Sequence, residues 1–226
     1  QRIMPKKNSV KLYSYCRSSA AYRVRIALNL KKLEAEVIPI HLLKNGGEQH
    51  SAAYRQINPS ELVPALLEAN AEQGFTLTQS LSILEYLDEK FTNTALLLPK
   101  DIQQRALIRA FSQSIACDIH PLNNLRVLQY LSAALEVSDE QKTAWYTHWV
   151  EVGFTGLEAQ LKNSNGQFCF GNSASFADCC LIPQVYNALR FNIDLSAYPK
   201  IQSIYTHCNT LSAFQNAAPE AQADAA

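Results

Sequence analysis

Apolar residues recur with two different periods along the chain. Up to about residue 91, stretches in which apolar and polar positions alternate are followed by stretches in which apolar residues return every three or four positions. Alternation indicates a half-buried strand, and the longer period indicates an amphipathic helix. VKLYSY at 10–15 alternates, for example, whereas the apolar positions between Tyr22 and Leu33 have the helical period.

This pattern predicts the order strand, helix, strand, helix, two strands and helix for the first part of the chain. The strands are expected over 10–15, 35–42, 64–70 and 75–78. The helices are expected between Tyr22 and Leu33, over 51–56 and over 80–91. AEQG at 71–74 predicts a hairpin turn between the last two strands.

Every segment beyond about residue 100 has the helical period. Helices are expected over 101–120, 122–135, 139–162, 176–190 and 199–211. TNTALLLPKD at 92–101 is predicted to be a linker, and PEAQADAA at 219–226 a frayed tail. The fold class is therefore α/β plus all-α, with a first domain over 8–91 and an all-helical domain over 100–218.

Charge and composition exclude several classes of partner. The 226 residues are 47% hydrophobic and 18% charged, and 20 Lys and Arg balance 20 Asp and Glu. A protein that binds nucleic acid or an anionic membrane usually has a basic excess, so neither partner is expected. No apolar run approaches the roughly 18 residues of a membrane span. The first residues, QRIMPKKNSV, contain no apolar signal core.

The six cysteines predict thiols rather than metal ligands or disulfides. None forms a CxxC pair, and the adjacent Cys179 and Cys180 suit neither zinc spacing nor an ordinary disulfide. Such a set is typical of a reduced, cytosolic protein. We therefore expect a cytoplasmic protein without a metal site.

The first candidate for a functional site is the strand-to-helix turn at Arg17–Ser19. Serine is a favoured helix N-cap, but the free N–H groups of a helix N-terminus also bind anions such as a thiolate or a carboxylate. Gln79 and Ser80 raise the same question at the start of the next long helix, where Ser80 is either a cap or part of a carboxylate site. Both interpretations stay open for each serine.

Two further candidates lie between these helix starts. Val63-Pro64 opens a strand, and a proline there indicates an edge position or a cis turn. A cis bond would leave the N–H and C=O of Val63 free to pair with an extended peptide ligand. The other candidate is the polar loop LLKNGGEQH at 42–50, which contains Gln49. Alone, this glutamine is expected to be exposed to solvent.

Five motifs in this order resemble the zeta-class signature of the glutathione transferases. They are YCRSSAAYRVRIAL (15–28), NPSELVPAL (58–66), TQSLSILEYL (78–87), ACDIHPLNNLRVL (116–128) and LIPQVYNALRF (181–191). The box SFAD fits as well, because Ser175 and Asp178 form a helix-capping pair. The resemblance covers residues 10–218. It implies the glutathione transferase fold, a thioredoxin-like domain and a helical domain that contributes the substrate pocket, assembled as a homodimer.

The resemblance also implies how glutathione is bound. Ser18 would hydrogen-bond the thiolate, Val63 would pair with the cysteinyl backbone, and Gln49 would reach the glycyl end. Gln79 and Ser80 would hold the γ-glutamyl carboxylate. The full set implied for glutathione is Ser18, Ser19, Ala20, Ala21, Tyr22, Arg23, Gln49, Val63, Gln79, Ser80, His120, Asn124 and Arg126.

The helical domain supplies His120, Asn124 and Arg126 of this set. One helical turn would place His120 and Asn124 on the same face, although Pro121 lies between them. Arg17 and Arg190 are the candidates for binding substrate carboxylates, because a planar guanidinium suits that geometry. The predicted catalytic residues are accordingly Ser18, Ser19, Arg17 and Arg190.

The family includes isomerases of cis enone diacids, whose reaction needs temporary loss of a double bond. The implied reaction converts maleylacetoacetate to fumarylacetoacetate, in tyrosine and phenylalanine breakdown, by adding a thiolate, rotating the former double bond and expelling the thiolate. A thiol has an ordinary pKa of about 8.5, and a helix N-terminus lowers such values. A neutral serine is no strong base, so Ser18 is expected to donate a hydrogen bond to the thiolate.

Two departures from the family pattern keep alternatives open. Ala20 stands where the pattern usually has cysteine, so that cysteine is not required for the chemistry here. Cys16 stands where an aromatic is usual, and C-R-S-S can be read as the CxxS motif of monothiol glutaredoxins, in which Cys16 would form a mixed disulfide with glutathione. A non-catalytic glutathione-binding module and a general glutathione transferase are further alternatives.

The choice of substrate rests on two positions. His120 is typical of the maleylpyruvate isomerase pattern. Leu125, however, stands where that pattern tends to have an additional arginine, and we therefore favour maleylacetoacetate.

Overall fold

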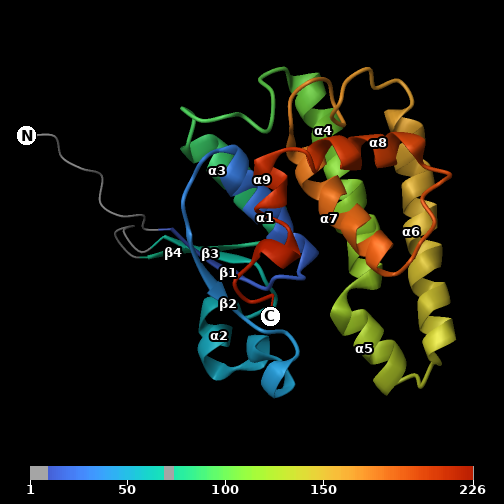
Figure 1. Cartoon of the computed structure of the whole chain (residues 1–226). Coiled ribbons are helices and arrows are strands. Elements are labelled where there is room, and N and C mark those ends of the chain that lie inside the picture. The colour runs from blue at the N-terminus through green and yellow to red at the C-terminus, as the bar shows by residue number, and fades with distance from the viewer. Residues whose placement is uncertain (1–9, 69–73, 226) are drawn as a thin grey trace, which may run out of the picture. The chain divides into compact units, whose positions relative to one another are not determined.

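The computed structural model of the chain describes residues 10–68 and 74–225 (Figure 1). The start of the expected first domain at 8–9 and most of the expected hairpin turn at 71–74 lie outside the described residues. The chain forms two compact units, which we describe separately. The first contains the described residues up to Leu96 together with those from Ser212 onward, and the second is Leu97–Leu211.

The first unit is built on a four-stranded sheet of order β2-β1-β3-β4. Its strands are β1 (Val10–Ser14), β2 (Glu36–Pro39), β3 (Ala65–Glu68) and β4 (Phe75–Thr78). β1 is parallel to β2 and antiparallel to β3, and β4 is antiparallel to β3. The alternation read in VKLYSY is confirmed, because Val10, Leu12 and Ser14 are buried while the residues between them are half-buried.

Three helices complete the order expected from the sequence. They are α1 (Ser19–Leu30), α2 (Ala52–Ile57) and α3 (Ser80–Lys90). α1 and α3 lie side by side on one side of the sheet and α2 lies on the other (Figure 1). The loop between β2 and α2 contains two short 3₁₀ turns, η1 (Lys44–Gly46) and η2 (Glu48–His50). This is the predicted thioredoxin-like unit.

A buried ion pair fixes α1 against α3. Lys31 Nζ, at the end of α1, lies 2.8 Å from Asp88 Oδ1 on α3, and the same ammonium donates to the carbonyl of Ala95 at 2.9 Å. The exposed fractions of the two side chains are 0% and 7%. Because a buried charge without its partner is strongly destabilising, this pair holds the two helices in one arrangement.

The second unit is helical throughout, as predicted. Its helices are α4 (Ile102–Asp118), α5 (Leu125–Ala133), α6 (Asp139–Leu161), α7 (Phe176–Arg190) and α8 (Pro199–Cys208). The predicted capping pair begins α7, where Asp178 Oδ2 accepts from Ser175 N at 2.9 Å and the Ser175 hydroxyl accepts from Ala177 N at 3.2 Å. Buried aromatic residues such as Phe111, Phe154 and Phe176 form the core of this unit.

The structure corrects the expected helix boundaries around residue 120. α4 ends at Asp118, and a 3₁₀ turn, η3 (His120–Asn123), separates it from α5. Pro121 lies in the first positions of that turn. A proline cannot donate the hydrogen bond that an α-helix interior requires. The expectation that His120 and Asn124 share one turn of an α-helix is therefore wrong.

The tail is the second correction. The segment at 219–226 was expected to fray, and residues 212–218 were expected to belong to the helical domain. Instead, the segment from Ser212, with α9 (Ser212–Gln215) and the 3₁₀ turn η4 (Pro219–Ala221), belongs to the first unit. In Figure 1 α9 lies beside α1. The carboxylate of Asp224 accepts a hydrogen bond from the Cys16 N–H at 2.9 Å.

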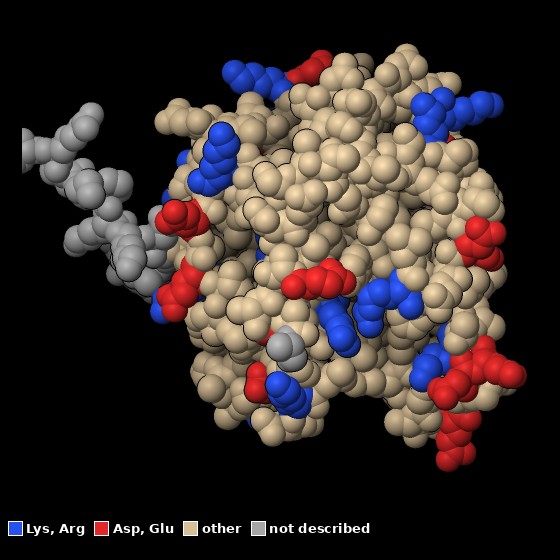
Figure 2. Space-filling view, viewed as in Figure 1, with Lys and Arg blue, Asp and Glu red and all other residues tan. Residues whose placement is uncertain are grey.

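The surface agrees with the balanced charge of the sequence. On the face shown in Figure 2, Lys and Arg are interspersed with Asp and Glu, and neither sign covers a large continuous area. Within residues 10–68 and 74–225, none of the helices combines the length and the apolar character that crossing a bilayer requires.

Candidate functional site

Ser18 is the N-cap of α1, which agrees with the first of the two interpretations of this residue, that of a helix cap. Its oxygen accepts a hydrogen bond from the Ala21 N–H at 3.2 Å. Capping uses only the oxygen as an acceptor, so the hydroxyl hydrogen remains available for donation. The Ala20 N–H in the same first turn also has no partner among the described residues, as is usual for the first N–H groups of a helix. The cap and an anion site are therefore compatible.

The turn before Ser18 is closed and mostly buried. The Ser18 N–H donates to the Tyr15 carbonyl at 3.0 Å. Cys16, inside this turn, is only 3% exposed. Burial, and after it the Asp224 carboxylate, raise the pKa of the Cys16 thiol. Nucleophilic cysteines have lowered pKa values and some exposure, so Cys16 lacks the environment that a monothiol oxidoreductase needs.

Val63 lies next to this turn. The Val63-Pro64 peptide bond is cis. The side chain of Val63 packs in one buried cluster with Tyr15, Cys16 and Tyr54. No hydrogen bond to the N–H or carbonyl of Val63 is found within the part of the chain that the structure describes. Its main chain is thus available to an extended ligand.

The start of α3 lies beside α1. Gln79, and not Ser80, occupies the N-cap position, which excludes the first of the two interpretations of Ser80, that of a helix cap. Gln79 has φ 71° and ψ 114°, a conformation that is costly for any residue except glycine and often marks a functional site. The hydroxyl of Ser80 instead accepts a hydrogen bond from Arg23 Nη1 of α1 at 3.1 Å. This buried contact ties the two helix N-termini together.

Gln49 is buried rather than exposed, which its sequence context did not predict. It has an exposed fraction of 7% and its Nε2 lies 3.4 Å from the carbonyl of Leu42. Its Oε1 has no hydrogen-bond partner among the described residues. Because buried acceptors are almost always paired, this oxygen is a candidate acceptor for an N–H group of a ligand.

The structure therefore brings the first-unit candidates together. Val63 packs on the turn that precedes Ser18, Arg23 connects that helix to Ser80, and Leu42, the partner of Gln49, packs against the same cluster as Val63. Ala21 and Tyr22 are almost completely buried and their N–H groups both donate to Ser18, so neither the side chains nor these N–H groups are presented to a ligand. Arg17 is exposed and Ser19 is buried.

The candidates of the second unit are distributed over three elements. His120 begins η3, Asn124 is the N-cap of α5 with its Oδ1 accepting from Arg126 N at 3.2 Å, and Arg126 is exposed. Arg190 is exposed at the end of α7. Its charge acts on the neighbouring Tyr146, whose pKa is nevertheless raised by burial.

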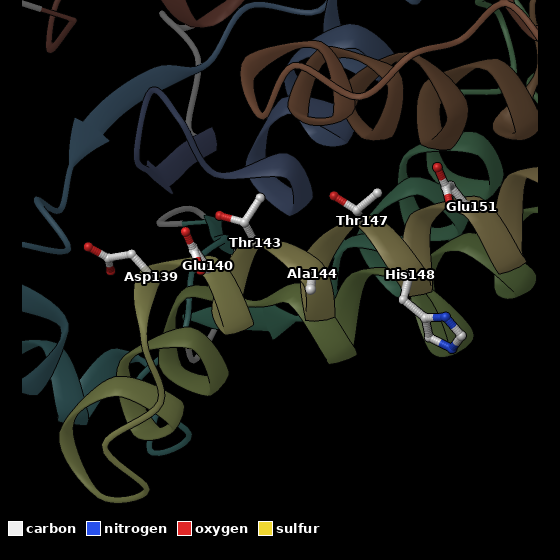
Figure 3. Close-up of a pocket in the computed structure, with 7 residues that line it drawn as sticks. All are labelled: Asp139, Glu140, Thr143, Ala144, Thr147, His148 and Glu151. Carbon is white, nitrogen blue, oxygen red and sulfur yellow. The ribbon is translucent and has the colours of Figure 1, made fainter.

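An open hollow along α6 does not involve any of these residues. It is lined by Asp139, Glu140, Thr143, Ala144, Thr147, His148 and Glu151 (Figure 3). The two threonines point to one side of the helix with Glu151, whereas His148 points to the other side. Of its three carboxylates, Asp139 is paired with Lys142 at 3.1 Å, and Glu140 and Glu151 leave the lining with a negative charge that disfavours a dicarboxylate.

Comparison with known proteins assigns the first unit to a family. Residues 12–95 match the model of the glutathione S-transferase N-terminal domain. A protein of Vibrio cholerae serotype O1, named probable maleylacetoacetate isomerase, is 51% identical over 217 residues, which cover 96% of this chain and 99% of that protein. The chain belongs to the zeta class of the glutathione transferases.

Solved structures agree with this membership. The holo structure of a maleylpyruvate isomerase, a bacterial zeta-class glutathione transferase, is similar with a TM-score of 0.89 at 41% identity, covering 96% of this chain and 100% of that one. A maleylacetoacetate isomerase of Methylobacterium extorquens AM1 with bound malonate and glutathione is similar with a TM-score of 0.88 at 38% identity, covering 96% and 99%. The thioredoxin-like unit and the helical unit of the expected glutathione transferase fold are thus confirmed.

Two residues near the candidate site were missed by the sequence analysis. Arg25 is buried, and its guanidinium donates to the carbonyls of Tyr15 and Cys16 at 3.2 and 2.9 Å. An arginine within the apolar run of RVRIAL could have indicated a buried hydrogen-bonding role, because charged side chains are rarely buried unless they have partners. Asp224 gave no signal, since its contact with Cys16 spans 208 positions of sequence.

Proposed function

We propose that this chain binds glutathione in its first unit and uses the bound thiol to isomerise maleylacetoacetate to fumarylacetoacetate. The observation that carries the proposal is Ser18, a helix N-cap whose hydroxyl accepts from Ala21 N and keeps its hydrogen for a ligand. The relatives named as isomerases, and the relative that contains bound glutathione, support the assignment.

The residues of the first unit suit a peptide that carries a thiol. The main chain of Val63 offers an edge for pairing, the strained turn at Gln79 offers helix N–H groups to a carboxylate, and Oε1 of Gln49 offers a buried acceptor to a peptide N–H. Glutathione presents peptide groups and carboxylates beside its thiol, which match these three features.

When bound, glutathione supplies a thiolate that adds to the cis double bond and leaves after rotation, so the trans isomer forms without net consumption of thiol. Ser18 donates its hydroxyl hydrogen to that thiolate, and the Ala20 N–H adds a second donor at the positive end of α1. Arg17 and Arg190 each bind a substrate carboxylate and so reduce the repulsion between a dianion and a thiolate. Ser19 and Arg23 keep the start of α1 in place.

Maleylpyruvate is the second candidate substrate, because a similar zeta-class structure is a maleylpyruvate isomerase. Leu125, in the first turn of α5, lacks the charge that would bind an additional carboxylate there. Comparing kcat/KM for the two substrates tests the choice. We expect a higher value for maleylacetoacetate, and a higher value for maleylpyruvate would reassign the substrate. Absence of glutathione binding in calorimetry would contradict the whole proposal.

The same proposal includes a metabolic pathway, a cell compartment and an oligomeric state. The reaction belongs to tyrosine and phenylalanine catabolism, in the cytoplasm, where all six cysteines remain free thiols as they are in this structure. The working form is a homodimer. Leu107 on α4, which is 55% exposed, is a position at which this association can be tested.

A further inference from the structure

The segment from Ser212 to Ala225 is held against α1 by polar contacts as well as by packing. Asn29 Nδ2 donates to the Ala213 carbonyl at 2.9 Å, and Arg25 Nε donates to the Ala217 carbonyl at 2.9 Å. Phe214 of this segment is fully buried. The segment is therefore an ordered part of the first unit.

The far end of this segment reaches the turn that precedes Ser18. Asp224 Oδ2 accepts a hydrogen bond from the Cys16 N–H at 2.9 Å, and the Asp224 carbonyl lies 3.5 Å from Cys16 Sγ. On the inner side of the same turn, Arg25 holds the carbonyls of Tyr15 and Cys16. The turn is thus fixed from both sides, by a buried guanidinium and by a carboxylate from the end of the described chain.

We propose that Asp224 is a positioning residue for Ser18, so that the segment 212–225 sets the direction in which the Ser18 hydroxyl meets the thiolate. The inference rests on the proposed function, because it assumes that the ligand of Ser18 is the glutathione thiol. Cys16 is buried and its N–H donates to Asp224, so removal of the Asp224 carboxylate takes away the acceptor that this N–H has in the structure. The turn would then move to find water, and Ser18, two residues on, would move with it.

An alternative role for Asp224 makes the opposite prediction. If this carboxylate acted only through its charge, its removal would favour any neighbouring anion, and the bound thiol would ionise more easily. Asparagine separates the two effects, because its side-chain oxygen still accepts from Cys16 N while its charge is zero. Alanine removes both the acceptor and the charge.

The test measures the pKa of bound glutathione from the ultraviolet absorbance of its thiolate across a pH series. For Asp224→Ala we expect the pKa to rise by about one unit and glutathione affinity to fall about tenfold, as for the loss of one good hydrogen bond. For Asp224→Asn we expect affinity close to that of the wild type and a pKa no higher. Glu220→Ala removes the exposed carboxylate of the same segment and serves as the matched control.

Amide hydrogen exchange at Cys16 and Ser18 provides a readout that does not depend on a ligand. We expect faster exchange at both amides in Asp224→Ala and unchanged exchange in Asp224→Asn and Glu220→Ala. A wild-type pKa and affinity in Asp224→Ala would overturn the inference, and so would an equal loss in Glu220→Ala. If the wild-type protein binds no glutathione, the proposed function fails. The exchange rates then decide on Asp224 alone: unchanged rates in Asp224→Ala overturn its role, and faster rates support it.

Discussion

At the scale of single residues, one oxygen atom carries two roles. Ser18 Oγ accepts a hydrogen bond from Ala21 N and so caps α1. The hydroxyl hydrogen on the same oxygen has no protein acceptor in the described structure. A hydrogen bond to an anion is about twice as strong as one between neutral groups. The helix cap therefore holds the donor in place, which avoids the entropy cost of ordering a free side chain.

The cysteines provide a residue-scale prediction. Burial raises the pKa of Cys16, Cys169 and Cys208, so these thiols stay protonated as the pH rises past the ordinary thiol value of about 8.5. Cys117 is the exposed cysteine. We expect an alkylating reagent at mildly alkaline pH to modify Cys117 and leave isomerisation intact, as mass spectrometry and an activity assay would show.

The control for this labelling is the unfolded protein, in which all six cysteines should react. Rapid modification of Cys16 in the native protein, with loss of activity, would contradict the account. That result would favour a monothiol mechanism instead.

At the scale of elements, the proposed glutathione site consists of two helix N-termini and two loops. α1 and α3 are joined by Arg23 and Ser80 near their starts and by Lys31 and Asp88 near their ends. Both helices therefore present their positive ends from a rigid base. The loop that carries Gln49 depends instead on local backbone conformation, since Gly47 has φ 100°.

Gly47→Ala tests that loop. A Cβ at this position would lie 2.8 Å from both amide atoms of Gln49, so it must displace that side chain. We expect glutathione Kd to rise about five- to tenfold, corresponding to one lost hydrogen bond, as measured by calorimetry.

Gly46→Ala is the matched control for this substitution. Gly46 also has a positive φ, of 76°, but a Cβ there meets nothing within 4 Å. Both variants should lose about 1 kcal/mol of stability through backbone strain, and only Gly47→Ala should lose affinity. Equal affinities for the two variants would show that Gln49 does not bind glutathione.

The elements also show which features a sequence can predict. Local signals sufficed for β1, for α7 with its Ser175–Asp178 capping box, and for Ser18 as a cap, because each depends on neighbours within four residues. The burial of Gln49 and the position of Asp224 depend on distant contacts. PEAQADAA has no apolar period. Its Asp224 accepts a hydrogen bond from Cys16, far away in sequence, and Arg25 holds Ala217 just before the segment.

At the scale of the whole molecule, the two units carry different parts of the proposed chemistry. The first presents the residues assigned to glutathione, and the second presents Arg190 and the residues of η3 and α5. The balanced charge gives no long-range attraction to nucleic acid. Specificity for a dianion must then come from individual arginines.

The proposed homodimer is a prediction at this scale. Sedimentation velocity should give twice the monomer mass at micromolar concentration. Leu107→Asp places a charge at an exposed apolar position of α4 and should weaken association if α4 lies in the dimer interface, with the fold retained because Leu107 is 55% exposed. A wild-type protein that sediments as a monomer at all concentrations would contradict the dimer.

The central claim is that a thiolate held at Ser18 drives the isomerisation, and proton NMR of the cis substrate tests it directly. Purified protein is mixed with maleylacetoacetate and either glutathione or S-methylglutathione, and Ser18→Ala is measured in parallel. The account predicts conversion to the trans isomer with free glutathione only, slowed between about ten- and a hundredfold in Ser18→Ala by loss of a charge-assisted hydrogen bond. Conversion with S-methylglutathione, or a wild-type rate in Ser18→Ala, would contradict it.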